Sequence, residues 1–213
     1  MELRQSEILR YAGFRGHTPD EAMLKKIEQL KEEILSSVTP RSIFKDVTFE
    51  TFGDESFFIS GVAFKSRKLT SQLKTAKRLL LFAATLGPES DRLLRKYSVS
   101  DRSKYVLTQA ILTEMIESYS NEICDGLAEK YKNEGLYLMP RFSAGYADLE
   151  LTAQKSFFEL LDISKRIGVT LNDECLMTPS KSVTAFIGLG TKPFCTKNGC
   201  SACDKTDCEF RRE

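Results

Sequence analysis

Six consecutive residues, Arg141-Phe142-Ser143-Ala144-Gly145-Tyr146, combine groups that suit the binding of a small polar ligand. The Arg141 guanidinium can bind a carboxylate through two parallel hydrogen bonds. Gly145 lets a ligand approach the main chain, and Tyr146 offers a flat aromatic face with a polar tip. An amino-acid-like ligand that carries an aromatic base would fit this set. The same pattern is typical of an edge strand that ends in a turn, so its surroundings must decide between the two.

Two acidic residues, Asp148 and Glu150, follow this segment directly. Their carboxylates could polarise a ligand site, or they could simply solvate a loop before the next helix. We favour the loop interpretation.

Four cysteines near the end of the chain form the strongest purely chemical signal. Their spacing is C-x4-C-x2-C-x4-C, at Cys195, Cys200, Cys203 and Cys208. Four thiolates this close can converge on one metal centre, whereas disulfides or free thiols are the alternative. Zinc accepts four thiolates, and so do iron–sulfur clusters, for which C-x4-C-x2-C opens one known ferredoxin spacing. We favour an iron–sulfur cluster, with zinc as the alternative.

The composition describes an ordinary globular chain and excludes several classes of protein. The 213 residues are 41% hydrophobic and 29% charged, and the net charge is +1. This charge gives no electrostatic reason to expect a nucleic acid or an anionic membrane as partner. The longest apolar run, from 79 to 86, is far shorter than the roughly 20 residues that span a bilayer. The charged N-terminus does not resemble a secretory signal, so we expect a cytoplasmic protein.

Several catalytic classes also lack their usual residues. The sequence has one histidine, His17, which precedes a predicted helix, so a histidine-rich metal site is excluded. A GxGxxG loop of the kind that opens nucleotide-binding βαβ units is missing, because Gly188-Leu189-Gly190 has no third glycine at the required spacing. The DxHxxG element of cobalamin-binding domains is missing as well, so we do not expect the chain itself to carry cobalamin.

Alternating helical and extended patterns predict a mixed α/β fold. The apolar run from 78 to 86 is typical of a central strand, and the small-residue run from 183 to 189 predicts another strand. The aromatic runs at 43–52 and 56–64 predict a β-hairpin. We also predict a long helix and a shorter one, from 101 to about 135 and from 152 to 167.

The order of these motifs resembles the activation domain of cobalamin-dependent methionine synthase. In that family an RxAxGY element precedes a helix ending in xxELLxxxxxxG, followed by an LTxSxxMxPxxSVxG element. Here the match runs through Arg141, Gly145, Tyr146, Glu159-Leu160-Leu161, Gly168, Leu171, Met177, Pro179, Ser182 and Val183. The upstream part is similar to stand-alone relatives of the domain, through Leu9-Arg10-Tyr11 and Ala84-Thr85-Leu86-Gly87-Pro88-Glu89. The family usually has alanine where this chain has Ser143, and a second ligand-binding tyrosine where it has Ile187.

The resemblance implies one domain over residues 1–190, with a bent antiparallel sheet surrounded by helices, and a separate cysteine-rich tail over 191–213. It further implies binding of S-adenosylmethionine, with Arg141 on the methionyl carboxylate, backbone contacts from Ser143 and Gly145, and Tyr146 shaping the site. The function it implies is a stand-alone reactivation subunit that is not catalytic alone. Such a subunit supports reductive methylation of cobalamin held by a partner methionine synthase that lacks this domain. The electron would come from a flavodoxin- or ferredoxin-like donor.

A second interpretation belongs to another class of protein. The chain could be a metal or iron–sulfur redox accessory protein for a corrinoid protein, with a decayed S-adenosylmethionine site. The two interpretations differ in whether the work is done at Arg141 or in the cysteine tail.

The tail leads to a direct prediction. Protein prepared without oxygen should contain one metal centre, measured by metal analysis and by electron paramagnetic resonance after reduction. Changing any one of the four tail cysteines to serine should weaken it, whereas Cys124→Ser and Cys175→Ser should not, because neither belongs to the spacing. Stoichiometric zinc without iron would eliminate the cluster, and four free thiols without metal would eliminate the site.

Overall fold

The fold was analysed in a computed structural model that describes residues 1–14 and 19–193. Helices and strands are mixed along the chain, as the sequence predicts. In chain order they are α1 (Gln5–Tyr11), α2 (Glu21–Ser37), β1 (Arg41–Val47), β2 (Glu50–Phe52), β3 (Ser56–Ile59), β4 (Val62–Lys65), α3 (Arg67–Leu73), β5 (Ala76–Thr85), α4 (Pro88–Ser100), α5 (Arg102–Lys132), β6 (Tyr137–Leu138), α6 (Ala153–Leu161), α7 (Ile163–Ile167), β7 (Thr170–Leu171), β8 (Met177–Thr178) and β9 (Ser182–Gly190).

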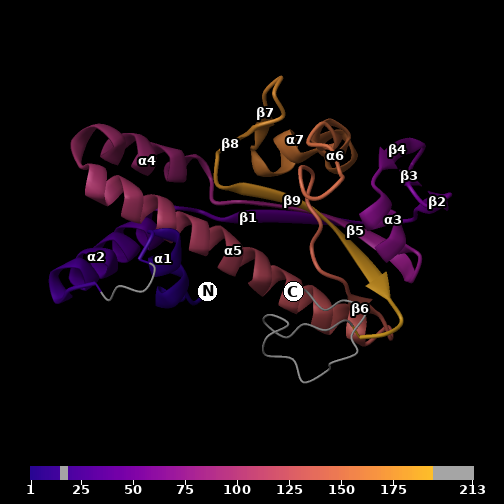
Figure 1. Cartoon of the computed structure of the whole chain (residues 1–213), viewed down its shortest axis with the longest axis horizontal. Helices are drawn as coiled ribbons and strands as arrows, with labels where there is room; N and C mark the ends of the chain where they lie inside the picture. The colour runs from indigo at the N-terminus through magenta and orange to yellow at the C-terminus, as the bar shows by residue number, and fades with distance from the viewer. Residues whose placement is uncertain (15–18, 194–213) are drawn as a thin grey trace.

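The described residues form a four-stranded antiparallel sheet at the centre of the molecule, in the order β1-β5-β9-β6. Strands β5 and β9 pair along their whole lengths, from Thr85 opposite Ser182 to Ala76 opposite Gly190 (Figure 1). Both strands are buried on both faces over most of their length, which explains their continuous apolar sequences. The predicted bent antiparallel sheet surrounded by helices is confirmed.

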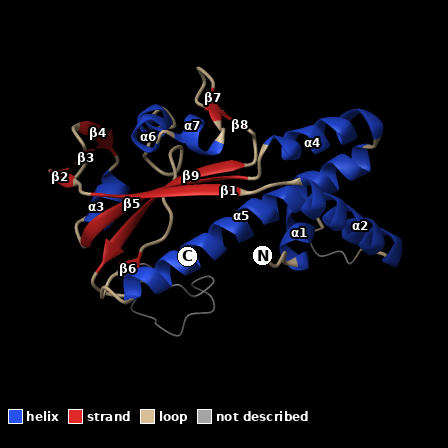
Figure 2. Cartoon of the chain, turned by 180° about the vertical axis from the view of Figure 1, so that it is seen from behind, coloured by secondary structure: helices blue, strands red, loops and turns tan. Residues whose placement is uncertain are grey.

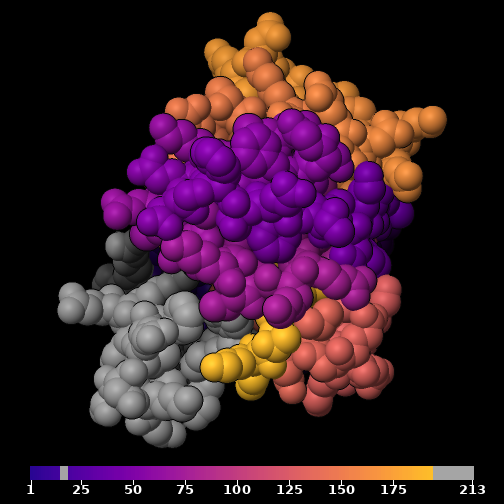
Figure 3. All heavy atoms as spheres, turned by 90° about the vertical axis from the view of Figure 1, so that its right-hand side faces the viewer, coloured from indigo at the N-terminus to yellow at the C-terminus, as the bar shows by residue number. Residues whose placement is uncertain are grey.

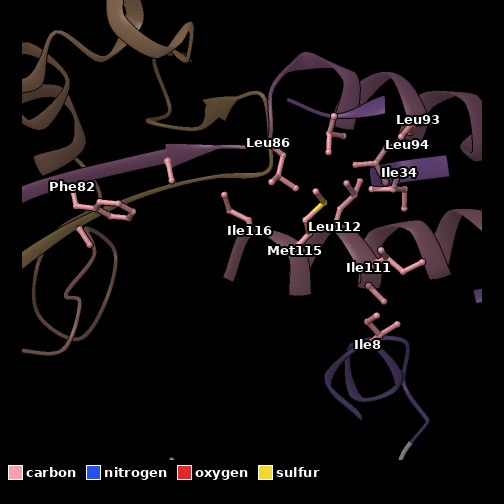
Figure 4. Close-up of a cluster of buried hydrophobic side chains, with 14 of the residues drawn as sticks. Ile8, Ile34, Phe82, Leu86, Leu93, Leu94, Ile111, Leu112, Met115 and Ile116 are labelled. Carbon is pink, nitrogen blue, oxygen red and sulfur yellow. The ribbon is translucent and has the colours of Figure 1, made fainter. Parts of the chain in front are cut away.

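Helix α5 crosses one face of the sheet and organises that side of the molecule. Its 31 residues correspond to a length of about 46 Å. Helices α1, α2 and α4 pack against its N-terminal half (Figure 2). The resulting core contains aliphatic side chains from α5 and its neighbours, seen in Figure 4 as Ile8, Ile34, Leu86, Ile111, Leu112 and Met115.

The opposite face of the sheet is covered by α6 and α7, and the small sheet β2-β3-β4 with α3 closes the end of this side (Figure 1). This second core is aromatic: the ring of Phe186 meets those of Phe57, Phe64 and Phe157 edge to face, with centroids 4.8–5.5 Å apart. Strand β9 therefore contributes side chains to both cores, because successive residues of a strand point to opposite faces.

Two expectations about element boundaries were wrong. The run at 43–52 is not one arm of a hairpin, because β1 pairs with β5 and only β2 pairs with β3. The predicted helix 152–167 is broken at Asp162, whose φ of 54° is left-handed and separates α6 from α7. In both places the tertiary packing, not the local pattern, decides where the element ends.

Gly188 allows the segment before Arg141 to dock against β9. The Met139 N–H donates to the Gly188 carbonyl at 2.8 Å, one step beyond the pairing of β6 with β9. A Cβ atom on Gly188 would lie 2.5 Å from Met139 Sδ and 3.4 Å from Ala76 Cβ. The absence of a side chain at 188 thus leaves the space beside β9 that the buried Met139 side chain fills.

We predict that Gly188→Ala destabilises the protein by about 1–3 kcal/mol, because the added methyl overpacks a buried contact. The matched control is Gly126→Ala, on the exposed face of α5, where nothing lies within 4 Å of the new atom. That change should stabilise by up to about 1 kcal/mol, since alanine is the better helix former. Urea unfolding followed by circular dichroism measures both, and equal effects of the two changes would contradict the proposed docking constraint.

Candidate functional site

The Arg141 segment is fixed to the sheet by one pair of backbone hydrogen bonds. Phe142 N–H donates to the Phe186 carbonyl at 2.9 Å, and Phe186 N–H donates back to the Phe142 carbonyl at 2.8 Å. Phe142 is buried in the aromatic core, and Ala144 packs against the same core. Arg141 projects to the other side of the chain, toward α5.

Arg141 forms an ion pair with a glutamate that the sequence analysis did not single out. Its Nη2 donates to Glu117 Oε2 on α5 at 2.7 Å, and its Nη1 lies 4.0 Å from Cys124 Sγ. The Arg141 side chain is 20% exposed and that of Glu117 is 42% exposed, so the pair sits at the margin of the core. Glu117 and Cys124 are two helical turns apart, and only the crossing of α5 over the sheet brings both to Arg141.

Cys124 has the role of a small, partly buried residue, as expected. It packs against the aliphatic core. Burial raises the pKa of its thiol, and the nearby Arg141 guanidinium opposes this rise. The thiol is therefore protonated at neutral pH and is a poor nucleophile.

The Gly145–Tyr146 turn presents an aromatic ring at the surface. Gly145 adopts a φ of 82°, and a side chain there would approach Leu151 Cδ1 to 3.2 Å. Its N–H donates to the Leu149 carbonyl at 2.8 Å, and the Tyr146 N–H donates to the Ser143 carbonyl at 3.1 Å. Tyr146 is 49% exposed and packs edge to face on Phe142, with ring centroids 5.2 Å apart. These N–H groups bond within the turn, and the Ser143 and Tyr146 carbonyls accept from the N–H groups of Tyr146 and Leu149, so the exposed Tyr146 ring is the group of the turn best suited to a ligand.

Asp148 anchors the end of this turn to helix α3. The Ser66 hydroxyl donates to its Oδ1 at 2.7 Å, and the Lys68 N–H donates to its Oδ2 at 3.1 Å. Burial raises the pKa of Asp148, but these donors outweigh it and the pKa falls below its ordinary value. The carboxylate is thus a structural anchor, which agrees with the loop interpretation over the polarising one.

A cleft of about 660 Å³ lies beside this anchor, between β4, the start of α3 and the segment 148–156. Charged side chains of both signs line it, including those of Lys65, Arg67, Asp148 and Glu150. Figure 3 shows this end of the molecule, where the purple residues of β2–β4 and α3 lie below the orange ones. Arg141 and Tyr146 are not among its lining residues, so the cleft and the Arg141 segment are separate features.

Ile187 and the four tail cysteines are the remaining positions that the sequence singled out. Ile187, at the position where the resembling family has a tyrosine, is fully buried in the aliphatic core and offers no side chain to a ligand. Cys195, Cys200, Cys203 and Cys208 lie outside the described residues, as does His17. Within residues 1–14 and 19–193, His, Cys, Asp and Glu side chains form no group of three that could hold a metal ion.

Comparison with known proteins decides the family. The model of the family described as vitamin B12 dependent methionine synthase, activation domain, matches residues 70–196, more than half of the chain. The chain belongs to this family. The match includes β5, α5, the Arg141 segment and β9, which together form the site described above. A search of curated proteins found no match.

A solved structure shows the same fold as this activation domain. The crystal structure of the MetH reactivation domain bound to AdoHcy superposes with a TM-score of 0.62 at 17% sequence identity. The alignment covers 88% of this chain and 70% of that one. The half-barrel of curled antiparallel sheet and helices is therefore shared with a reactivation domain at very low sequence identity. In the part of the chain that the structure describes, no helix is long and apolar enough to cross a membrane.

The Asp148 anchor gives a pH-dependent prediction. Asp148→Asn should destabilise the protein by about 1 kcal/mol at pH 7, as for the loss of a helix-capping carboxylate at an exposed position. Because the folded pKa is lowered, the carboxylate stabilises the fold above its unfolded pKa of about 3.9 and loses this effect as pH falls through the folded pKa.

The difference between wild type and Asp148→Asn should therefore shrink below about pH 4, measured by urea unfolding across pH. Asp173→Asn, in the exposed β7–β8 loop, is the matched control and should change stability little at either pH. A deficit for Asp148→Asn that stayed constant down to pH 3 would show that the carboxylate charge is not its cause.

Proposed function

We propose that this chain binds S-adenosylmethionine at the Arg141–Tyr146 segment and supports reductive methylation of cobalamin in a partner methionine synthase. Membership of the activation-domain family supports the cobalamin-binding partner. The crystallisation of a reactivation domain of the same fold with AdoHcy supports a ligand of this class. The stand-alone form and the choice of partner are part of the proposal.

The Arg141–Glu117 pair is the observation that carries the proposal. Opposite charges with their N and O atoms 2.7 Å apart match the amino-acid end of such a ligand. The guanidinium would take the α-carboxylate through another edge of its donor fork, and Glu117 would accept from the α-ammonium. Because the pair lies at the margin of the core, the Glu117 side chain is accessible, at 42% exposure, while the ion pair holds Arg141 in place. Tyr146, half exposed nearby in sequence, offers a stacking face for the adenine.

The methyl transfer requires the protein to position the two reactants and needs no acid or base group. The sulfonium carries an activated methyl group, so the S–CH3 bond breaks as the reduced cobalt of the partner's cobalamin donates the electron pair for the new Co–CH3 bond. S-adenosylhomocysteine leaves with the sulfur lone pair, and no proton is moved. One external electron converts cob(II)alamin to the reactive state, and a flavodoxin- or ferredoxin-like donor would supply it. The role of Arg141 and Glu117 is to hold the donor in orientation.

The rest of the chain enters the proposal in two parts. Residues 1–190 would act as the ligand-binding domain, and 191–213 as a metal-binding tail with an iron–sulfur cluster or, alternatively, zinc on its four cysteines. A cytoplasmic location would place the chain with such a partner.

Calorimetric titration tests the binding. Wild-type protein should bind S-adenosylmethionine and S-adenosylhomocysteine, and Arg141→Met should weaken both by roughly 1.5–3 kcal/mol, about tenfold or more. Glu117→Gln should also weaken both ligands, because the amide cannot form an ion pair with the ammonium.

Arg166→Met on α7 is the matched control, since this exposed arginine lies on the far side of the sheet from α5. It should bind as wild type does. No binding by wild type at millimolar ligand would reject the proposed function. Equal affinity for wild type and Arg141→Met would remove Arg141 from the site.

A further inference from the structure

Strand β4 has a free edge, and the hairpin before it determines which backbone groups lie there. A two-residue turn, Ser60-Gly61, joins β3 to β4, and both turn residues have positive φ. Such a turn closes on a hydrogen-bonded pair, here Ile59 with Val62, and bonded pairs then alternate along the ladder. The N–H and C=O groups of Ala63 and Lys65 therefore point away from β3. Within residues 1–14 and 19–193, no other backbone group pairs with them.

The free edge of β4 opens into the cleft of about 660 Å³, because Ala63 and Lys65 both line it. The opposite wall is the segment 148–156, which includes the start of α6. The buried side chains of Phe64 and Leu149 also line the cleft. Its volume lies in the usual range for binding sites, and the four residues of β4 offer about 13 Å of edge for pairing.

The charges without an ion pair on the strand side of the cleft are positive. Lys65 and Arg67 are exposed and form no ion pair in the part of the chain that the structure describes. On the opposite wall, the carboxylates of Asp148 and Glu150 already accept hydrogen bonds from neighbouring groups. Glu55 precedes β3, so it lies one strand further from a chain added at β4. The charge nearest to an added strand is therefore that of Lys65.

We propose that this cleft binds an extended acidic segment of a partner protein, which joins the small sheet as a strand beside β4. The proposal goes beyond S-adenosylmethionine binding and does not depend on it. Backbone hydrogen bonds to Ala63 and Lys65 supply the affinity, and side chains supply the specificity. Residues opposite each other in a ladder share one face of the sheet, so an acidic residue fits opposite Lys65 and an apolar one opposite Phe64.

Two other roles for this edge predict different behaviour. A lysine on an edge strand can serve only to prevent unwanted pairing, in which case no extended chain binds there. A second copy of this chain fits poorly, because β4 (Val62–Lys65) has no acidic residue to lie opposite Lys65.

Fluorescence anisotropy with labelled peptides tests the proposal. The first probe is a hexapeptide of alternating glutamate and valine, and the second has lysine in place of glutamate. Two further versions of the first are N-methylated, either at the glutamates, whose N–H groups face β4 in the proposed pairing, or at the valines, whose N–H groups face away. We expect the lysine peptide and the version methylated at glutamate to bind at least about tenfold more weakly than the first, and the version methylated at valine to bind as the first does.

Variants of the protein test the same contacts from the other side. Ala63→Pro removes one outward N–H group at an edge where proline is tolerated, so it should fold and bind about tenfold more weakly. Thr51→Pro, whose N–H lies on the outer edge of β2, is the matched control and should bind as wild type does. Lys65→Glu should reverse the preference between the glutamate and lysine peptides.

Thermal unfolding shows whether each variant is folded, and the N-methylated pair tests the backbone contact without any substitution. No binding of the glutamate peptide at millimolar concentration overturns the proposal. Equal binding of the glutamate and lysine peptides, or of the two N-methylated versions, overturns it as well. All of these results leave the proposed S-adenosylmethionine site untouched, because Arg141 and Tyr146 do not line the cleft.

Discussion

The pair of backbone hydrogen bonds between Phe142 and Phe186 is the constraint on which the site depends. It attaches the Arg141 segment to the edge of β9 after β6 has ended, where Gly188 leaves room for the Met139 side chain. Because side chains alternate along an extended chain, burying Phe142 in the aromatic core directs Arg141 to the opposite side, toward α5. The pairing of Phe142 with Phe186 thus determines both how this segment packs on the edge of β9 and the direction of the Arg141 guanidinium.

Helix α5 is the second partner in this arrangement, because its Glu117 accepts a hydrogen bond from the Arg141 guanidinium at 2.7 Å. The two residues are 24 positions apart in the sequence. Strand β9 lies between two cores, aliphatic on the α5 side and aromatic on the α6 side, and is buried over most of its length. A rigid strand on one side and a long helix on the other are what a site needs when its function is orientation.

Much of the fold could be predicted from the sequence, and the failures have physical causes. The apolar run of β5 and the long periodic pattern of α5 are strong local signals, and both were confirmed. The break at Asp162 was missed because a left-handed residue inside an apolar helical pattern leaves no periodic trace. For the site, Arg141 and its turn have a motif, but Glu117 does not. Its proximity to Arg141 follows from the way α5 crosses the sheet, which no local pattern encodes.

The central claim is that this activation domain acts on cobalamin held by another protein, and methyl transfer to that cobalamin tests it most directly. The chain would be mixed with a cobalamin-loaded methionine synthase that lacks its activation domain, a one-electron reductant and S-adenosylmethionine. Formation of methylcobalamin would be followed by absorbance. We expect the rate to rise with added protein and to fall strongly with the Arg141→Met variant. A rate that did not change over a tenfold range of added wild-type protein would contradict the account.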